Sequence, residues 1–374
     1  MRRLPVPHPA VLAAGVLSCA IAMVGCTSGG SPAPAGSSAA GPAAATGQGD
    51  ALRWHSCSVE GAPMRCAGLR VPLDYRHPAG RKITLALSEV PATAPAAQQQ
   101  GDLLVNPGGP GSSGRIWAAI VAQSLDRAVA SEYNIVGFDP RGVGASVPAL
   151  HCDPGFFAGV RPDYIPADRQ AEQVLIGRAK GYAADCERRY GWLLPFMTTA
   201  DAARDMDAIR AALGQRQISY FGYSYGTYLG QVYATLFPHR LRKMVLDSVV
   251  DPRGVWYADN ISQDYAFEGR IRAFFSWVAD HDAVYHLGST EAEVQQAWDQ
   301  ARARLEAHPV PGPSGPMIGP DEFDDTFLQG GYLDELWPGF AQALSSYLND
   351  GQAGDLISQY QGYGKQGENE FAVY

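Results

Sequence analysis

The sequence of 374 residues contains no run of five or more basic residues, and its acidic side chains outnumber its basic ones. The formal net charge is −9 at pH 7, and the isoelectric point lies near 5.4. Proteins that bind nucleic acid use clustered lysine and arginine side chains to neutralise phosphates. The charge pattern therefore argues against a nucleic-acid partner.

Two motifs that bind common ligands are also missing. The sequence has no Cys-x-x-Cys and no His-x-x-x-His spacing, so a metal site is the weaker interpretation of its cysteines. No Gly-Lys-Ser or Gly-Lys-Thr follows its glycine-rich loop, which excludes a P-loop nucleotide site. We therefore predict a protein that uses no metal ion and no cofactor.

The apolar run near the N-terminus is too short to span a bilayer comfortably, but it fits an export signal. A basic start at residues 1–3 precedes the apolar residues 11–24. The sequence Met-Val-Gly-Cys at residues 23–26 then resembles a bacterial lipobox, which is cleaved before the cysteine. A plain secretory signal with a chance cysteine is the alternative.

We predict a signal peptide over residues 1–25 and a diacylglycerol on the thiol of Cys26. Residues 26–50 are almost entirely Ala, Gly, Ser, Pro and Thr, a composition without the apolar bulk to fold, so they would form a tether. The protein is thus expected on the outer face of the cytoplasmic membrane, anchored there as a lipoprotein through Cys26, or secreted.

Six cysteines are present, and the two nearest the N-terminus are lost with the signal or carry the lipid. Four remain, and an even number in an exported chain indicates disulfides. Their order suggests the pairs Cys57–Cys66 and Cys152–Cys186. Four cysteines allow three pairings, so the other two stay open.

The most informative stretch is Gly-Tyr-Ser-Tyr-Gly at residues 222–226. Residues 217–221 before it predict a short buried strand, and residues 227–237 after it predict a helix that Pro238 ends. Glycines on both sides of the serine allow strand and helix backbones to cross closely, and the helix N-terminus favours negative charge. This pattern is typical of a nucleophile elbow with Ser224 as nucleophile. A structural turn serine is the alternative.

A second glycine-rich stretch lies upstream. Leu103-Leu104-Val105 predicts a short strand, and the loop after it reads Asn-Pro-Gly-Gly-Pro-Gly-Ser-Ser-Gly at residues 106–114. An oxyanion hole needs backbone N–H groups with no side chain in the way. The expected donors are the N–H of Tyr225 and one from Gly108 or Gly109. A flexible Gly/Pro turn is the alternative.

A third motif, Phe-Asp-Pro-Arg-Gly-Val-Gly-Ala-Ser at residues 138–146, lies between the other two. In this order the three motifs resemble those of the secreted tripeptidyl aminopeptidases, in the prolyl-aminopeptidase-like branch of α/β-hydrolase serine peptidases. The resemblance covers about residue 54 to the C-terminus. It implies an exopeptidase that releases short peptides from free N-termini through an acyl-enzyme on Ser224. We interpret Asp139 and Arg141 as a structural pair that braces the loop near the site.

Predicted strands alternate with predicted helices, which indicates an α/β fold with a mostly parallel sheet. We expect strands at residues 83–90, 103–105, 133–138, 218–221 and 244–246. The clearest helix covers residues 199–213. After Pro252 the sequence is helical and strand-poor, as in a cap over the active site of this fold. We therefore divide the chain into an α/β-hydrolase core at residues 51–252 and a helical cap at residues 253–374.

Ser224 lacks an obvious base in the sequence. In this fold the catalytic acid and then the histidine follow the serine along the chain, and the resemblance implies that both come from strands after the cap. We expect these last core strands beyond Tyr374, so that the cap is incomplete at its C-terminus. The alternative is a triad of Ser224 with Asp247 or Asp251 and with His286.

An aminopeptidase must hold the substrate ammonium, and carboxylates are its natural partners. Glu368-Asn369-Glu370 resembles the Glu-Asn element that serves this purpose in prolyl aminopeptidases. The resemblance implies Glu368 as the ammonium site, with Glu370 second. A solvated acidic helix start is the alternative. A further acidic cluster between residues 321 and 325 is expected at the surface.

Two other classes of function stay open. A lipid-anchored esterase or other small-substrate hydrolase would use the same serine and the same loop. A non-catalytic surface protein, or a catalytically inactive fragment, agrees with the missing base. A preference for substrates with a free N-terminal amine would distinguish the peptidase from the esterase.

Overall fold

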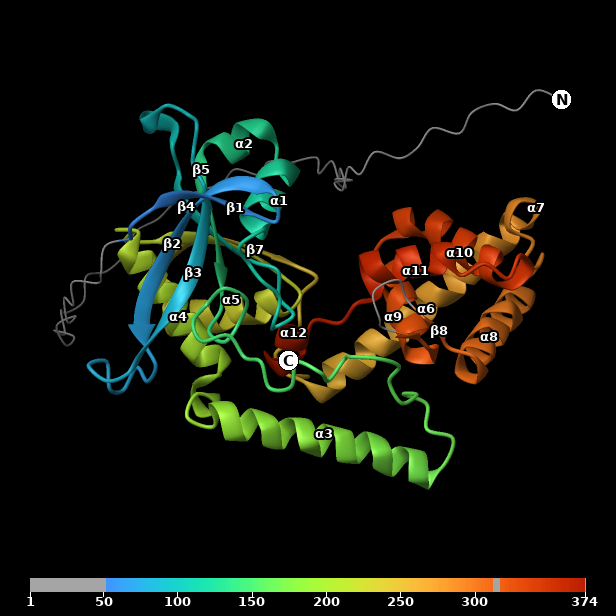
Figure 1. The fold of residues 1–374 in the computed structure, drawn as a ribbon. Coiled ribbons are helices and arrows are strands. Elements are labelled where there is room, and N and C mark those ends of the chain that lie inside the picture. The colour runs from blue at the N-terminus through green and yellow to red at the C-terminus, as the bar shows by residue number, and fades with distance from the viewer. Residues whose placement is uncertain (1–51, 312–316, 374) are drawn as a thin grey trace.

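The computed structural model describes residues 52–311 and 317–373 (Figure 1). A sheet with helices on both faces forms one part, and a second group of helices lies beside it. The export signal, Cys26 and the tether fall outside the described residues. In the described part of the chain, no helix is both long enough and apolar enough to cross a membrane.

The sheet has seven strands in the order β1-β2-β3-β5-β4-β6-β7. Antiparallel pairing joins β1 (His55–Val59), β2 (Ala62–Pro72) and β3 (Lys82–Val90), and also joins β3 to β5 (Tyr133–Asp139). Parallel pairing joins β5, β4 (Gly101–Asn106), β6 (Ile218–Tyr223) and β7 (Leu241–Asp247). The five expected strands are confirmed, whereas β1 and β2 were not predicted.

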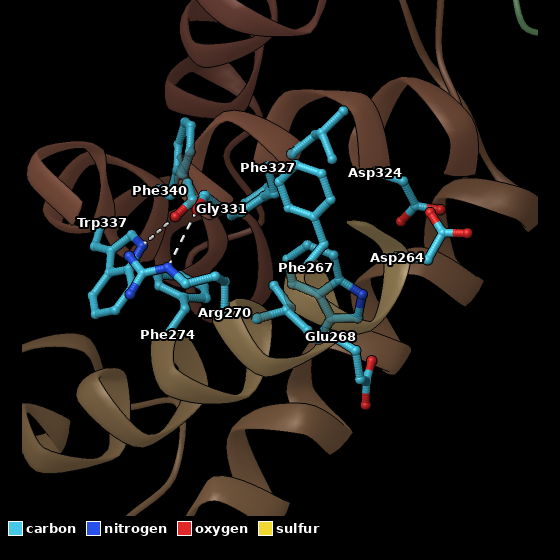
Figure 2. A pocket seen from close by; sticks show the side chains of 14 residues that line it. Asp264, Phe267, Glu268, Arg270, Phe274, Asp324, Phe327, Gly331, Trp337 and Phe340 are labelled. Carbon is cyan, nitrogen blue, oxygen red and sulfur yellow. Dashed lines mark hydrogen bonds between the residues drawn. The ribbon is translucent and has the colours of Figure 1, made fainter. Parts of the chain in front are cut away.

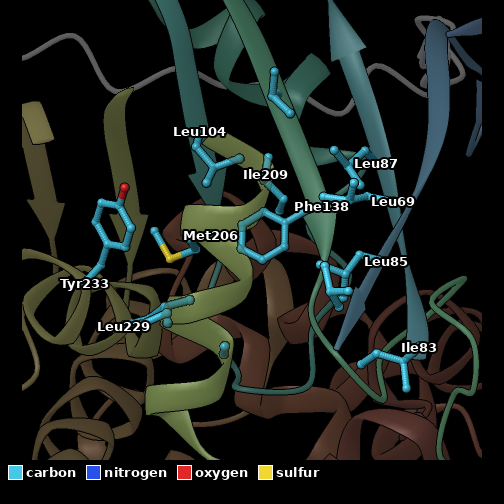
Figure 3. Close-up of a cluster of buried hydrophobic side chains, with 14 of the residues drawn as sticks. Leu69, Ile83, Leu85, Leu87, Leu104, Phe138, Met206, Ile209, Leu229 and Tyr233 are labelled. Atoms are coloured by element: carbon cyan, nitrogen blue, oxygen red, sulfur yellow. The ribbon is translucent and has the colours of Figure 1, made fainter. Parts of the chain in front are cut away.

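Helices cover both faces of this sheet. On one face lie α4 (Thr199–Ala212) and α5 (Tyr225–Leu236); on the other lie α1 (Trp117–Ser124) and α2 (Arg127–Ser131). Figure 3 shows the first face, where Met206 and Ile209 of α4 lie beside Leu104 and Phe138 of the sheet. The expected helix at residues 199–213 is therefore α4, whose apolar residues at helical spacing enter the core.

A second hydrophobic core belongs to the helices that follow β7. We call them the cap helices: α6 (Tyr257–Asp280), α7 (Asp282–Tyr285), α8 (Glu291–Ala307), α9 (Pro320–Leu328), α10 (Trp337–Asn349) and α11 (Gly354–Gln359). A short hairpin of β8 (Val310–Pro311) and β9 (Met317–Ile318) precedes α9. Phe274, Phe327 and Phe340 are buried at the centre of this core.

Two helices run between these parts of the molecule. The long α3 (Arg169–Tyr190) follows β5, and the last helix, α12 (Glu368–Val373), returns from the cap helices to the core (Figure 1). Phe371 of α12 stacks on Phe156, with ring centroids 5.1 Å apart, and Val373 packs against the core of the sheet. The last residues, which were expected within the cap, thus contact the core instead.

The expectation of a surface acidic cluster at residues 321–325 is wrong. Asp321 is 0% exposed, Glu322 1% and Asp325 9%. Arg161, from the segment between β5 and α3, is also buried and accounts for this arrangement. Its Nε donates to Glu322 at 2.6 Å and its terminal nitrogen donates to Asp325 at 2.5 Å. Burial of carboxylates requires such paired, hydrogen-bonded charges.

Both suggested disulfides are present. The Cys57–Cys66 bond joins β1 to β2 across a sequence separation of 9. The Cys152–Cys186 bond joins the loop after β5 to α3 across a separation of 34. The second bond therefore closes the longer loop in the unfolded chain.

Replacing Cys152 and Cys186 together by serine should lower the free energy of unfolding by about 3–4 kcal/mol, because the bond restricts a long loop in the unfolded state. The matched double replacement of Cys57 and Cys66 should lower the free energy of unfolding by about 1 kcal/mol less, because the Cys57–Cys66 bond closes a shorter loop. Urea unfolding of the oxidised parent and both variants measures the two losses. A larger loss from the Cys57–Cys66 pair would contradict the expectation.

Candidate active site

Ser224 lies between the end of β6 and the start of α5, with φ +50° and ψ −126°. This backbone conformation is uncommon for any residue other than glycine and is found where surrounding contacts enforce it. A Cβ on Gly222 would lie 2.5 Å from the Gly226 carbonyl oxygen, and a Cβ on Gly226 would lie 2.5 Å from the Asn106 carbonyl oxygen. Ser224 itself is exposed. The backbone thus has the geometry of a nucleophile elbow.

The glycine-rich loop after β4 meets this elbow directly. Gly108 has φ +100°, and a Cβ there would lie 2.8 Å from the Tyr225 nitrogen and 3.1 Å from the Ser224 Cβ. The Tyr225 N–H is in the first turn of α5, where helix N–H groups have no partner within the helix. The loop backbone and the N-terminus of α5 therefore converge on one point beside the serine.

The two alternative loop donors differ in their partners. The Gly108 N–H already donates to the Asn106 side-chain oxygen at 3.0 Å. The Gly109 N–H has no hydrogen-bond partner among the described residues. This difference favours Gly109, together with Tyr225, as the pair of oxyanion donors.

Asp139 and Arg141 brace the neighbouring loop, but they do so separately and not as a pair. Asp139 accepts hydrogen bonds from the Ser113 hydroxyl at 2.6 Å and from the Ala145 N–H at 2.8 Å. Arg141 instead binds Asp205 of α4 through two nitrogens, both at 2.7 Å. Burial would lower the pKa of Arg141, but the hydrogen bonds to Asp205 raise it above its ordinary value.

Sequence reasoning missed Asp205. Its position offered a signal, because it sits on the apolar face of α4 between Ala202 and Ile209, where a charge needs a buried partner. Tyr75 also donates to Asp205 at 2.6 Å. The buried Asp205 therefore joins the loop after β5 to α4 and to the segment after β2.

Glu368 of α12 is held by several donors. Its carboxylate accepts hydrogen bonds from the backbone N–H of Cys152 at 2.7 Å and of Asp153 at 3.1 Å. The Tyr182 hydroxyl donates at 2.7 Å, and His151 Nδ1 lies 3.1 Å away. Burial would raise the pKa of Glu368, but these hydrogen bonds outweigh it and lower the pKa. Its carboxylate is therefore charged, with most of its acceptor capacity in use.

Asn369, the next residue, clamps the loop after β5. Its side-chain oxygen accepts the Gly144 N–H at 2.8 Å, and its side-chain nitrogen donates to the carbonyl oxygens of Gly142 at 2.9 Å and Leu150 at 2.7 Å. An amide with both a donor and an acceptor group is suited to such bridging between backbone groups.

Glu370 reaches the glycine-rich loop itself, where its carboxylate accepts a hydrogen bond from the Ser112 hydroxyl. It is exposed, and Ser112 is its only hydrogen-bonding or ion-pairing partner among the described residues. Glu370 therefore has free acceptor capacity beside the loop that approaches Ser224. The geometry favours Glu370 over Glu368 as a site for a substrate ammonium.

The alternative triad is not assembled. His286 is exposed at the end of α7, which lies on the side of the cap helices away from the sheet (Figure 1). Asp251 is half-buried, and hydrogen bonds from Arg253 lower its pKa to about 2. Asp247 contacts the elbow only through its carbonyl oxygen, which accepts the Ser224 N–H at 3.1 Å. Among the described residues, no side chain forms a hydrogen bond with the Ser224 hydroxyl.

The acid and the histidine expected beyond Tyr374 stay a prediction. Metal chemistry has no ready ligand set here, since the described residues contain no group of three or more His, Cys, Asp or Glu side chains that could hold an ion.

Comparison with known proteins agrees with this geometry. The family model described as alpha/beta hydrolase fold matches residues 103–355. The chain is 44% identical over 308 residues to a tripeptidyl aminopeptidase of Streptomyces coelicolor, a match that covers 79% of this chain and 56% of that protein. The chain belongs to the α/β-hydrolase family. Within that family it is similar to the tripeptidyl aminopeptidases, as its motifs indicate.

Two mycobacterial proteins are also similar. The chain is 34% identical over 285 residues to serine protease Hip1 of Mycobacterium tuberculosis, covering 72% of this chain and 52% of that protein. It is 35% identical over 322 residues to carboxylesterase B of the same organism, covering 81% of this chain and 60% of that protein. The chain thus spans about half the length of the curated relatives it matches.

Replacing Gly108 by alanine should lower kcat/KM for acyl-ester and peptide-amide substrates by about 10²–10³, because the added methyl group would lie against the Tyr225 N–H and block the oxyanion position. Gly61→Ala is the matched control, since Gly61 also has a positive φ of +84° but no atom within 4 Å of the added Cβ. Steady-state kinetics of both variants, with circular dichroism to check folding, test this. Equal activity of the two variants would contradict it.

Proposed function

We propose that the protein is an exported serine peptidase that releases short peptides, tripeptides in particular, from free N-termini. The observation that carries this proposal is the strained turn at Ser224, beside which the glycine-rich loop at Gly108 approaches the Tyr225 nitrogen. A tripeptidyl aminopeptidase and a serine protease among its relatives support the peptidase assignment.

In this proposal the Ser224 hydroxyl attacks the scissile carbonyl and forms a tetrahedral intermediate. The N–H groups of Tyr225 and Gly109 donate to the oxygen as its negative charge develops, and the N-terminus of α5 adds a favourable dipole. A histidine base takes the serine proton and returns it to the leaving amine. Water then hydrolyses the acyl-enzyme.

The exopeptidase specificity is assigned to α12. Its residues 368–370 contact two loops around the site, the loop after β5 and the glycine-rich loop after β4, so the helix would form the wall that stops a peptide at its N-terminus. Glu370 would receive the substrate ammonium, and Glu368 would hold the wall in place and add a second negative charge. An N-terminal ammonium bound there would set how many residues precede the cleaved bond.

Export is supported by the two disulfides, since such bonds persist in oxidising compartments. The lipid anchor at Cys26 would then hold the enzyme at the membrane surface, with residues 26–50 as the tether.

An esterase is the second candidate function, because carboxylesterase B is among the relatives. It would use the same Ser224 and the same oxyanion donors. The two functions differ in the need for a free amine, which only the peptidase would recognise.

A fluorophosphonate probe should label the active enzyme covalently at Ser224. Ser224→Ala should abolish labelling, and Ser248→Ala, an exposed serine after β7 with φ +59°, should not. In-gel fluorescence and peptide mapping measure the outcome. Persistent labelling of Ser224→Ala would assign the nucleophile to another residue.

Glu370→Gln should raise KM about tenfold or more for tripeptide amides with a free amine, because a charge-assisted hydrogen bond to the ammonium is lost. The same variant should leave KM for N-acetylated tripeptide amides unchanged. Glu335→Gln, a neutralised exposed carboxylate in the cap, is the control. A parallel change for both substrate classes would remove the ammonium assignment.

A further inference from the structure

The cap helices enclose a cavity of about 340 Å³ (Figure 2). It lies among α6, α9, α10 and the turn η4 (Gln329–Gly331). Its inner wall is aromatic, formed by the buried rings of Phe274, Phe327 and Phe340. A cavity of this size takes a ligand larger than a single side chain.

The backbone of the turn η4 packs directly against aromatic rings of the cavity. Gly330 and Gly331 carry no side chains, and a Cβ on Gly330 would lie 3.2 Å from the Phe340 ring. The ring of Phe267, half-buried, packs against the Gly331 backbone. The accessible ring surface of the cavity therefore belongs mainly to Phe267, because Phe274, Phe327 and Phe340 are each at most 3% exposed.

Carboxylates dominate the charge around this cavity. Asp264, Glu268 and Asp324 line it, against a single lining cation, Arg270. Figure 2 shows Asp264 and Asp324 on one side of the cavity. Asp264 has no hydrogen-bond or ion-pair partner among the described residues.

The other two lining carboxylates each have one arginine partner. Glu268 pairs with Arg272 at 2.7 Å, and Asp324 pairs with Arg302 at 2.9 Å. Burial raises the pKa of Asp324, although Arg302 acts to lower it. The Asp324 carboxylate is thus only partly compensated, because Arg302 also binds Asp163.

Arg270, the one cation that lines the cavity, lies across from Asp264 and already interacts with other groups. Arg270 lies over the Trp337 ring at 4.8 Å, donates to the Gly331 carbonyl oxygen at 3.2 Å and pairs with Asp334. In Figure 2, Arg270 and Trp337 lie across the cavity from Asp264. The cavity therefore has an aromatic interior and a negative side on which Asp264 lacks a partner among the described residues.

We propose that this cavity is an exosite for a peptide segment in which a lysine or arginine neighbours a bulky apolar residue. The apolar side chain would contact the half-buried Phe267 ring, and the cation would approach Asp264 and Asp324. The choice of a peptide over another amphipathic cation rests on the proposed peptidase function.

The exosite and the elbow are connected through α6. Trp256, just before this helix, packs on the Tyr225 ring with centroids 5.4 Å apart. Asp264 follows eight residues later, a rise of about 12 Å along the helix. An extended peptide covers that distance in about four residues. A substrate longer than the released fragment could therefore use both sites.

The test is a binding measurement on the Ser224→Ala chain, which prevents turnover. The probe is the capped peptide acetyl-Gly-Phe-Lys-Gly-amide, whose blocked N-terminus excludes the ammonium site. Isothermal titration should show binding that weakens about tenfold when the probe's lysine is replaced by glutamate or its phenylalanine by alanine. Because no catalysis is involved, failed binding and a failed peptidase assignment are separate outcomes.

Asp264→Asn should weaken binding of this probe about three- to tenfold, because the contact between the Asp264 carboxylate and the probe's lysine ammonium is lost. Asp280→Asn is the matched control, because Asp280 is an exposed carboxylate on the same helix outside the cavity. Phe267→Ala should also weaken binding, and thermal unfolding confirms that each variant is folded.

Three results would overturn the proposal. One is no binding of the capped probe at millimolar concentration. Another is equal affinity of Asp264→Asn and Asp280→Asn for it. The third is binding of phenethylamine as tight as that of the peptide, which would reassign the cavity to a small amine.

Discussion

Close backbone contact at the elbow is the constraint on which the rest of the site depends. Ser224 keeps a positive φ because β6, α5 and the loop after β4 meet there without side chains between them. Gly222 and Gly226 allow strand and helix to cross, and Gly108 allows the loop to reach the N-terminus of α5. The parallel pairing of β4 with β6 places that loop beside the serine. Any side chain at these glycines would clash with the backbone of the elbow and separate Ser224 from the glycine-rich loop.

The loops around this point are held by groups that are distant in sequence. Asp205 anchors Arg141 from α4, and Asn369 anchors the same loop region from the last helix. Glu370 of that helix contacts the glycine-rich loop through Ser112. The short α12 thus connects the cap helices to the loops of the core, so the position of the cap and the shape of the site are coupled through a few hydrogen bonds.

Much of the core could be predicted from local patterns. The strands β3 to β7, the helix α4 and the glycine-flanked serine have signals within a few adjacent residues, and the disulfide pairs follow from cysteine order. The strands β1 and β2 were missed, although buried residues alternate along β2 from Ala67 to Val71. The acidic residues near residue 321 were wrongly expected at the surface, because their burial depends on Arg161, 160 positions earlier in the chain.

The sequence by itself determined the α/β-hydrolase family, the glycine-flanked turn at Ser224 and the loop that approaches it, because steric needs of a tight turn restrict the residue types within a short segment. Only the tertiary structure decided the partner of Arg141, the hydrogen bond that already occupies the Gly108 N–H and the contrast between a satisfied Glu368 and an open Glu370. The physical reason is that burial, and the hydrogen bonds that a group makes, depend on which distant segments come together. Such long-range contacts leave no local pattern in the chain.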